Sequence, residues 1–234
     1  MCVVINLWGG PGCGKSTTMA KIFSELKIKG YNVEMVSEFA KDLVYEKRNE
    51  TMKDELYIFA KQNHRLFRVK DKVDVIVTDR PLPLTCVYDK VYGKNDKNLH
   101  TLVRRTFQEY DNINILLGFN ESNYKEEGRL QTKEEALSLH HKIAEELELY
   151  GNVLSAYTME NIIEEVKKRL WMTKFKPGDE VFVRDNANSK WKKAILLNYE
   201  PARVYQYYTY KIDDKTSSYN KFITKEVPDE NSQS

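Results

Sequence analysis

The sequence has little cysteine, no long hydrophobic run and almost no net charge of either sign. Its 234 residues include only three cysteines, Cys2, Cys13 and Cys86, and their separations match no metal-ligand spacing. No apolar run approaches the ~20 residues needed to cross a bilayer, which excludes membrane insertion, and nothing before the first predicted strand has the pattern of a signal peptide. We therefore expect a reduced, cytoplasmic protein with no membrane partner.

The charge balance limits what the molecule can bind. Lysine and arginine number 37 against 35 aspartates and glutamates, which leaves a formal net charge of +2. A protein with so little net charge does not attract nucleic acid over its whole surface, so any such binding requires a local patch. The length allows one hydrophobic core, or one core and a small satellite domain.

A glycine-rich segment near the N-terminus has the spacing G-x-x-x-x-G-K-S. Residues 9–16 read GGPGCGKS and lie between apolar residues 3–7 and a predicted helix at 15–29. Glycines allow consecutive backbone N–H groups to converge on a phosphate, and the positive end of the helix dipole points at the same anion. We predict a nucleotide-binding loop, and the alternative is a glycine-rich turn that binds nothing. The expected binding residues are Gly10, Gly12, Cys13, Gly14, Lys15, Ser16 and Thr17.

Two side chains of this loop have specific expected roles. Lys15 is expected to contact the β- and γ-phosphates of ATP, and the Ser16 hydroxyl to bind Mg²⁺. ATP and Mg²⁺ are therefore the predicted cofactors.

Apolar strands alternate with helical segments along residues 1–172. Strands are predicted at 3–7, 33–38, 73–78, 113–119 and 152–157, with helices between them and a last helix at 159–171. This alternation is typical of a parallel sheet that is covered on both faces. The predicted fold class is α/β, a P-loop NTPase fold with a five-stranded parallel sheet flanked by helices.

Charged residues stand at the ends of the second and third predicted strands. Glu38 ends the segment at 33–38, and Asp79 and Arg80 directly follow the segment at 73–78. Ligands of such sheets bind at the carboxyl ends of the strands. A carboxylate there can accept a hydroxyl proton or hold Mg²⁺, and an arginine can hold an anion, as phosphoryl transfer to an acceptor requires. The alternative is that each carboxylate is a solvated strand end or a helix cap.

Three motifs together resemble those of the P-loop nucleoside and nucleotide kinases. They are GGPGCGKST near the N-terminus, the carboxylate in VSEFA, and TDRP after the third strand. The resemblance covers residues 1–172 and includes the deoxynucleoside, thymidylate and ribosylnicotinamide kinase groups and related bacteriophage-encoded kinases. It implies that Glu38 is the base for the acceptor hydroxyl, and that Asp79 and Arg80 lie beside the acceptor's 5′ end.

One residue departs from the family pattern. Deoxynucleoside kinases usually have serine, and thymidylate kinases an aromatic residue, where this chain has Pro81. The resemblance therefore predicts the reaction class and leaves the acceptor open.

Kinases of this kind close a short lid over ATP and use its arginines in the transition state. The matching segment is the polar stretch at 120–131, in which Arg129 is the first candidate for a charge clamp and Lys125 the second. Arg104 and Arg105 are further candidates. An ordinary solvated loop is the alternative for each of them.

Three features of the predicted helices have specific interpretations. Thr132, with Glu135 three residues later, predicts a capping box at the start of the helix at 133–149. His140 falls on the apolar stripe of that helix, so we expect it to pack rather than to bind a metal. In the deoxynucleoside kinases the helix that matches the one around Gln62 faces the base of the acceptor, so Gln62 is a candidate for reading a base edge.

Residues 174–228 have a different pattern, with a Pro-Gly turn followed by short alternating strands and no helix. They resemble a small all-β SH3-like barrel, and 229–234 form a polar tail that we expect to be disordered. Trp191, three lysines and six tyrosines there form a candidate contact for single-stranded nucleic acid. Aromatic residues that fill the barrel core are the alternative, and protein binding is another.

The predicted function is transfer of the γ-phosphate of ATP to a nucleoside, nucleotide or nucleoside-like small molecule. The first alternative is a polynucleotide or modified-base DNA kinase whose strand is bound by the C-terminal barrel. The second is an ATP-driven regulatory switch that binds a protein partner. The expected catalytic residues are Lys15, Glu38, Asp79, Arg80 and Arg129, with Ser16 and Asp79 as metal ligands.

Overall fold

Two units make up the chain in the computed structural model, Met1–Leu170 and Trp171–Ser234. The structure describes residues 2–120, 131–151, 153–154, 158–173, 178–184, 192–201, 206–212, 215–219 and 222–224. The domain limits expected from the sequence, 1–172, 174–228 and 229–234, stay predictions.

A parallel sheet forms the centre of the first unit. Its strands are β1 (Val3–Trp8), β2 (Val33–Val36), β3 (Val75–Thr78) and β4 (Asp111–Leu116), in the order β2-β3-β1-β4. Every pair in this sheet is parallel, with Val4 opposite Ile76 on one side and Asn112 on the other. β-Branched residues make up half of β1 and all of β3, and every residue of both strands is buried, which suits strands covered on both faces.

The prediction of a fifth strand at 152–157 was wrong for this sheet, which has four strands in the described part of the chain. Val153 makes only an isolated parallel bridge to Asn114, and the Leu154 N–H donates to the Asn114 carbonyl at 2.9 Å. Val153 is 42% exposed, so its burial supplies little energy to extend the pairing. Residues 152 and 155–157 lie outside the described residues.

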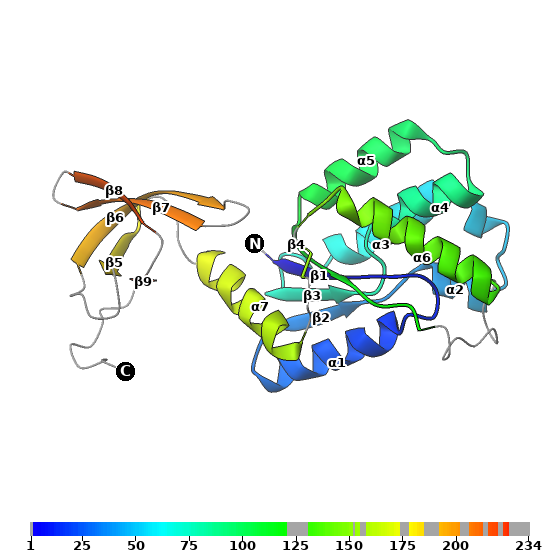
Figure 1. Ribbon diagram of the computed structural model, residues 1–234, viewed down its shortest axis with the longest axis horizontal. Coiled ribbons are helices and arrows are strands. Elements are labelled where there is room, and N and C mark those ends of the chain that lie inside the picture. The colour runs from blue at the N-terminus through cyan, green and yellow to red at the C-terminus, as the bar shows by residue number, and fades with distance from the viewer. Residues whose placement is uncertain are drawn as a thin grey trace. The chain divides into compact units, whose positions relative to one another are not determined.

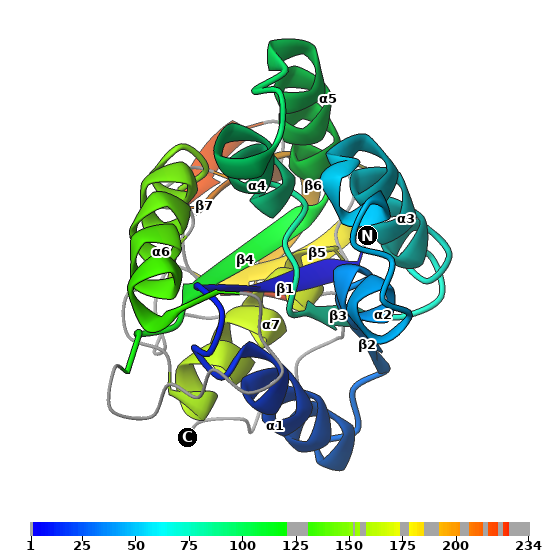
Figure 2. The same cartoon turned by 90° about the vertical axis from the view of Figure 1, so that its right-hand side faces the viewer.

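The helical segments are α1 (Lys15–Ile28), α2 (Ala40–Tyr45), the 3₁₀ turn η1 (Thr51–Lys53), α3 (Glu55–Phe67), α4 (Leu84–Tyr92), α5 (Lys97–Gln108), α6 (Lys133–Glu148) and α7 (Met159–Thr173). Helices cover both faces of the parallel sheet (Figures 1 and 2). α1 and α7 lie on one face, and α3, α4, α5 and α6 on the other.

The predicted capping box of α6 is confirmed. Thr132 Oγ1 accepts from the Glu135 N–H while Glu135 Oε2 accepts from the Thr132 N–H.

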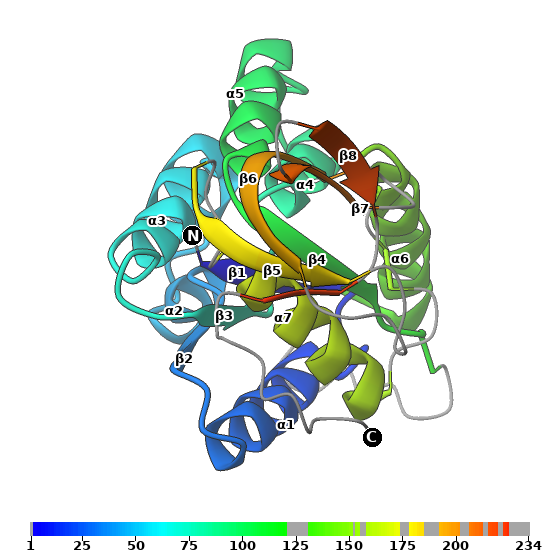
Figure 3. The same cartoon turned by 90° about the vertical axis from the view of Figure 1, so that its left-hand side faces the viewer.

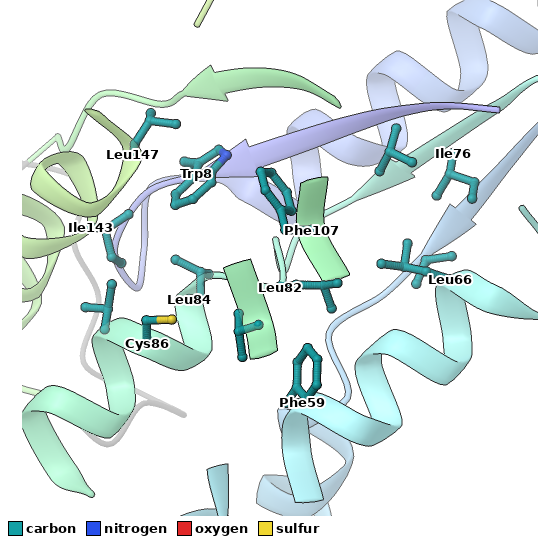
Figure 4. Packing of buried hydrophobic residues seen from close by; sticks show 14 of the residues in the cluster. Trp8, Phe59, Leu66, Ile76, Leu82, Leu84, Cys86, Phe107, Ile143 and Leu147 are labelled. Carbon is teal, nitrogen blue, oxygen red and sulfur yellow. The ribbon is translucent and has the colours of Figure 1, made fainter. Parts of the chain in front are cut away.

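The two core layers follow from the alternation of side chains along a strand. Val3, Ile5 and Leu7 of β1 face α1 and α7, whereas Val4 and Trp8 face the helices of the other layer. Figure 4 shows the second layer, in which Trp8 lies beside Phe107 of α5 and Ile143 and Leu147 of α6. Covering both faces fixes the sheet and thereby the loops at its carboxyl edge.

One buried carboxylate joins three helices of the second layer. Glu146 of α6 has a side chain that is 1% exposed, and it accepts from Lys90 of α4 at 2.6 Å, Arg104 of α5 at 3.0 Å and the Tyr150 hydroxyl at 2.9 Å. Burial alone would raise the pKa of Glu146, but the hydrogen bonds from these three groups hold it below the ordinary carboxyl value. Arg104 is therefore engaged in this cluster, which argues against it as a lid residue.

Glu146→Gln is expected to lower the free energy of unfolding at neutral pH by about 1–3 kcal/mol, because three donors lose a charged acceptor. A carboxylate with a depressed native pKa stabilises the fold above its unfolded pKa, and this contribution is lost as pH falls through the native pKa. Urea unfolding at neutral and at acidic pH measures this. The difference between the two proteins should shrink in acid, and an equal difference at both pH values would contradict the assignment.

The described strands of the second unit are β5 (Glu180–Arg184), β6 (Lys192–Pro201), β7 (Gln206–Ile212), β8 (Lys215–Tyr219) and β9 (Phe222–Thr224). They form an antiparallel sheet in the order β8-β7-β6-β5-β9 (Figures 1 and 3). Its pairing shifts register between Leu196 and Asn198 of β6. These strands agree with the predicted all-β pattern, while closure into an SH3-like barrel stays a prediction.

Among the described residues, none of the helices is both long and apolar enough to span a membrane.

Candidate active site

The loop between β1 and α1 has the backbone geometry of an anion cradle. Gly9, Gly12 and Gly14 have φ values of 145°, 85° and 77°, which residues with a Cβ rarely adopt. Gly14 directly precedes α1, so the first N–H groups of that helix have no partner within it. These groups are positioned to bind an anion at the positive end of the helix.

Close packing against α6 fixes the position of this loop. A Cβ on Gly10 would lie 2.8 Å from the Ala136 carbonyl oxygen, so only glycine fits there. The Gly10 N–H donates to His140 Nδ1 at 3.2 Å. Burial lowers the pKa of His140, with His141 and Lys15 adding to the effect, and the neutral imidazole keeps Nδ1 as an acceptor. His140 thus packs within the fold, as its apolar stripe predicted, and also supports the loop.

Lys15 folds back onto the same loop. Its Nζ donates to the Gly9 carbonyl at 2.8 Å and to the Gly10 carbonyl at 2.9 Å. Burial lowers the pKa of Lys15 relative to its ordinary value, although Glu38 and Asp79 oppose this effect. The ammonium group is therefore held at the loop before any phosphate arrives.

Asp79 links the loop to the second strand. Its carboxylate is fully buried, Oδ2 accepts from the Ser16 hydroxyl at 2.6 Å, and Oδ1 accepts from the Glu38 N–H at 2.8 Å. Lys41 of α2 donates to Oδ2 at 2.8 Å and also contacts Ser16 Oγ. Burial tends to raise the pKa of Asp79, but the hydrogen bonds from Lys41 and Ser16 bring it below the ordinary value, so the group is ionised.

The residues at Asp79 fit a Mg²⁺ ion. Hydroxyl and carboxylate oxygens are the hard ligands that Mg²⁺ prefers, and Ser16 and Asp79 present one of each in contact. The Lys41 ammonium already contacts both oxygens, which shows that a cation is accommodated there. The roles of Ser16 and Asp79 as metal ligands stay predictions.

Lys41→Met tests whether the lysine occupies the cation position. Without Lys41, Asp79 loses a charged donor, so the Tm in EDTA is expected to fall by roughly 2–4 °C, corresponding to about 1 kcal/mol. The rise in Tm on adding Mg²⁺ without nucleotide should be larger than in the wild type, because no side chain competes for the oxygens. Differential scanning calorimetry measures both. Lys61→Met on the exposed side of α3 is the control, and identical Mg²⁺ responses in the wild type and Lys41→Met would refute the interpretation.

A second cluster lies beside Asp79, around Arg80. The Arg80 guanidinium is 2% exposed and donates from Nη1 to Glu38 Oε1 at 2.8 Å and from Nη2 to Glu55 Oε2 at 3.3 Å. The guanidinium carbon lies 4.9 Å from the centre of the Tyr88 ring. Glu38 and Arg80 are thus adjacent, as the strand ends predicted.

Glu55 enters the cluster from the first turn of α3, which is capped by Asp54 accepting from the Tyr57 N–H at 3.0 Å. Burial raises the pKa of Glu55 to about 7, although Arg80 acts in the opposite direction. No motif pointed to Glu55, Lys41 or Tyr88. The only sequence signal was that Lys41 lies three residues after Glu38, whereas Glu55 and Tyr88 had none.

The connection that carries Glu38 is held by Gln62 of α3. Gln62 is 1% exposed, its Oε1 accepts from the Phe39 N–H at 2.8 Å, and its Nε2 donates to the Ser37 carbonyl at 3.3 Å. With both amide atoms bonded to the backbone on either side of Glu38, Gln62 positions that residue, and the structure offers no support for a base-reading role.

The structure brings together five predicted site residues: Lys15, Ser16, Glu38, Asp79 and Arg80. Arg129 and Lys125 lie outside the described residues, so the lid stays a prediction. Arg105 is exposed on α5. Phosphate-loop, metal-binding and acceptor-side candidates thus meet at the carboxyl ends of β1, β2 and β3.

Comparison with known proteins agrees with this arrangement. A family model described as an AAA domain matches residues 4–162, more than half of the chain. The chain belongs to this AAA domain family. The matched residues of the AAA domain include the phosphate loop, Glu38, Asp79 and Arg80. No curated protein matches the chain.

Three solved structures align with most of the chain. The NadR protein in complex with NR aligns with a TM-score of 0.51 and 17% identity over 75% of this chain and 52% of its own. Deoxyadenosine kinase from M. mycoides with bound dATP has a TM-score of 0.44 and 19% identity over 71% and 98% of the two chains. Thymidylate kinase from Ehrlichia chaffeensis has a TM-score of 0.46 and 16% identity over 73% and 100%. The first likeness shows that the α/β P-loop fold is shared.

Proposed function

We propose that the chain is an ATP- and Mg²⁺-dependent phosphotransferase that transfers the γ-phosphate of ATP to a nucleoside, nucleotide or nucleoside-like small molecule. The observation that carries the proposal is the position of Asp79, which contacts Ser16 of the phosphate loop with one oxygen and the Glu38 backbone with the other. Asp79 is therefore the single buried side chain between the phosphate loop and Glu38, whose carboxylate is suited to acceptor chemistry.

The chain's own residues account for most of the proposed mechanism. Lys15 leaves the carbonyls of Gly9 and Gly10 and contacts the β- and γ-phosphates, and the N–H groups at the start of α1 bind the same anion. Mg²⁺, held by Ser16 and Asp79, would supply charge neutralisation at the phosphates. Catalysis is then mostly positioning and charge stabilisation.

Glu38 acts on the acceptor side. Its carboxylate accepts the proton of the acceptor hydroxyl as the oxygen forms a bond to the γ-phosphorus, and the bond between that phosphorus and the β–γ bridging oxygen breaks, which releases ADP. Arg80 holds Glu38 through the 2.8 Å hydrogen bond. We place Arg129 in the lid as a further charge clamp.

We also propose that the second unit is a separate SH3-like module, with the division near residue 172 and a C-terminal tail at 229–234. Its connection to single-stranded nucleic acid or a protein partner stays a prediction. Lys192 and Lys193 are exposed, and Lys193 pairs with Glu180 at 2.9 Å, while Lys190 and Trp191 lie outside the described residues.

A transfer assay with γ-labelled ATP tests the proposal. The full-length protein is incubated with nucleosides, nucleotides, nicotinamide riboside and oligonucleotides, and the labelled products are separated. We expect label in a small-molecule acceptor. Label only in oligonucleotides, with steep dependence on salt, would favour the polynucleotide alternative, because phosphate contacts weaken as salt rises.

A further inference from the structure

Arg80 is unavailable as a ligand for an acceptor phosphate. Its guanidinium is 2% exposed and is held between Glu38 at 2.8 Å and Glu55 at 3.3 Å, with the Tyr88 ring 4.9 Å away. Two of its five N–H donors are bonded to carboxylates, and its burial limits access to the other three, so Arg80 has little to offer an incoming anion.

Among the three charged groups of the cluster, a carboxylate is the most exposed. The Glu38 side chain is 16% exposed, compared with 2% for Arg80 and 7% for Glu55. Two carboxylates and one guanidinium also leave the cluster with an excess of negative charge when both glutamates are ionised, which requires a pH above the Glu55 pKa of about 7. An acceptor that approaches Glu38 therefore meets a negative group.

Among the described residues, the other cations near Glu38 are already engaged. Lys15 is held at the Gly9 and Gly10 carbonyls, where it faces the phosphates of ATP in the proposed mechanism. Lys41 pairs with Asp79 at 2.8 Å. Arg65, which donates to the Ser37 carbonyl beside Glu38 at 3.2 Å, also pairs with Asp42.

We infer that Glu55 is a specificity-determining residue: by holding the second amino group of Arg80, it leaves a carboxylate facing the acceptor and so selects uncharged or cationic alcohols over nucleoside monophosphates. This inference rests on the proposed function. Glu55 does not touch the acceptor and acts through Arg80. The selected acceptor supplies a hydroxyl, whose proton passes to Glu38 as its oxygen takes the phosphoryl group from ATP. A monophosphate brings a second anion next to Glu38, and repulsion between like charges disfavours its binding.

The test compares kcat/KM for matched pairs of acceptors with the full-length protein. The probes are the four deoxynucleosides and nicotinamide riboside, each set against its own 5′-monophosphate. For the best pair, we expect the wild type to prefer the alcohol by about tenfold or more, a factor that a modest repulsion between charges supplies.

Glu55→Gln is expected to reduce that preference by about tenfold, because the neutral amide removes one negative charge from the cluster and holds the Arg80 amino group less tightly than a carboxylate does. A merely structural defect would lower kcat/KM for both members of a pair and leave the ratio unchanged. Glu50→Gln is the matched control, since Glu50 is 86% exposed, pairs with Lys53 and loses the same charge. In Glu50→Gln, the ratio of kcat/KM for the alcohol to kcat/KM for its monophosphate should equal the wild-type ratio.

The outcomes separate this inference from the proposed function. The wild type could convert a monophosphate to its diphosphate with a kcat/KM equal to or above that for the nucleoside. This result would overturn the specificity role of Glu55 and leave the kinase assignment intact. A ratio in Glu55→Gln that equals the wild-type ratio would do the same. If Glu55→Gln does not fold, the wild-type ratio alone decides. Absence of label in every member of the panel would overturn the proposed function and this inference with it.

Discussion

Replacing Lys15 with alanine is expected to lower phosphoryl transfer by about 10²–10³-fold or more, because the site loses the positive charge aimed at the β- and γ-phosphates. The fold should persist. Within the described part of the chain, the hydrogen bonds of the Lys15 ammonium go to the Gly9 and Gly10 carbonyls, which are part of the loop itself. Transfer of label from ATP measures the loss, and circular dichroism and Tm report on the fold.

Lys21→Ala is the control for that experiment, because Lys21 lies on the same helix and is exposed. It should retain wild-type turnover. Unchanged turnover in Lys15→Ala itself would refute the assignment of residues 9–16 as the phosphate loop.

Glu38→Gln is expected to lower kcat by about 10²–10⁴-fold with little change in the affinity for ATP, because a positioned base acts in the transition state. Glutamine has nearly the same shape as glutamate and can still accept a hydrogen bond from Arg80. It cannot take the proton of the acceptor hydroxyl. Steady-state kinetics with the acceptor found by the transfer assay give kcat, and calorimetric titration with ATP gives the affinity.

Glu34→Gln on the exposed part of β2 removes the same charge from the same strand and should leave kcat unchanged. Asp79→Asn should show the opposite pattern, with weakened use of Mg²⁺-ATP. If Glu38→Gln instead weakens Mg²⁺-ATP use and Asp79→Asn lowers only kcat, then the two roles are interchanged.

Local patterns in the sequence predicted the phosphate loop and the strand ends. The glycine loop is a contiguous segment, so the spacing of its glycines predicts its backbone geometry directly. Three of its glycines adopt positive φ. Glu38, Asp79 and Arg80 were predictable because parallel strands end at one edge, so residues distant in sequence meet there. The AAA domain match covers all of these positions.

Other parts of the site depend on packing that no local pattern contains. Lys41 reaches Asp79 and Ser16 only because of where α2 starts, and Glu55 meets Arg80 only because α3 packs beside β3. Periodicity identified α3 as a helix and Asp54 is a recognisable cap, but neither indicates that the next residue pairs with an arginine 25 positions away. The predicted fifth strand failed for a related reason: its apolar residues suggested pairing, yet Val153 lies at an edge with little to cover it.

The partition of the γ-phosphate between an acceptor and water distinguishes a phosphotransferase from an ATP-driven switch. With full-length protein, saturating Mg²⁺-ATP and the acceptor panel, we expect label to enter an acceptor much faster than it appears as inorganic phosphate, since the site brings a carboxylate base to the phosphate loop through Asp79. An ATP-driven switch would instead release only inorganic phosphate, slowly and at the same rate with or without any acceptor. That second result would contradict the assignment of the chain as a phosphotransferase.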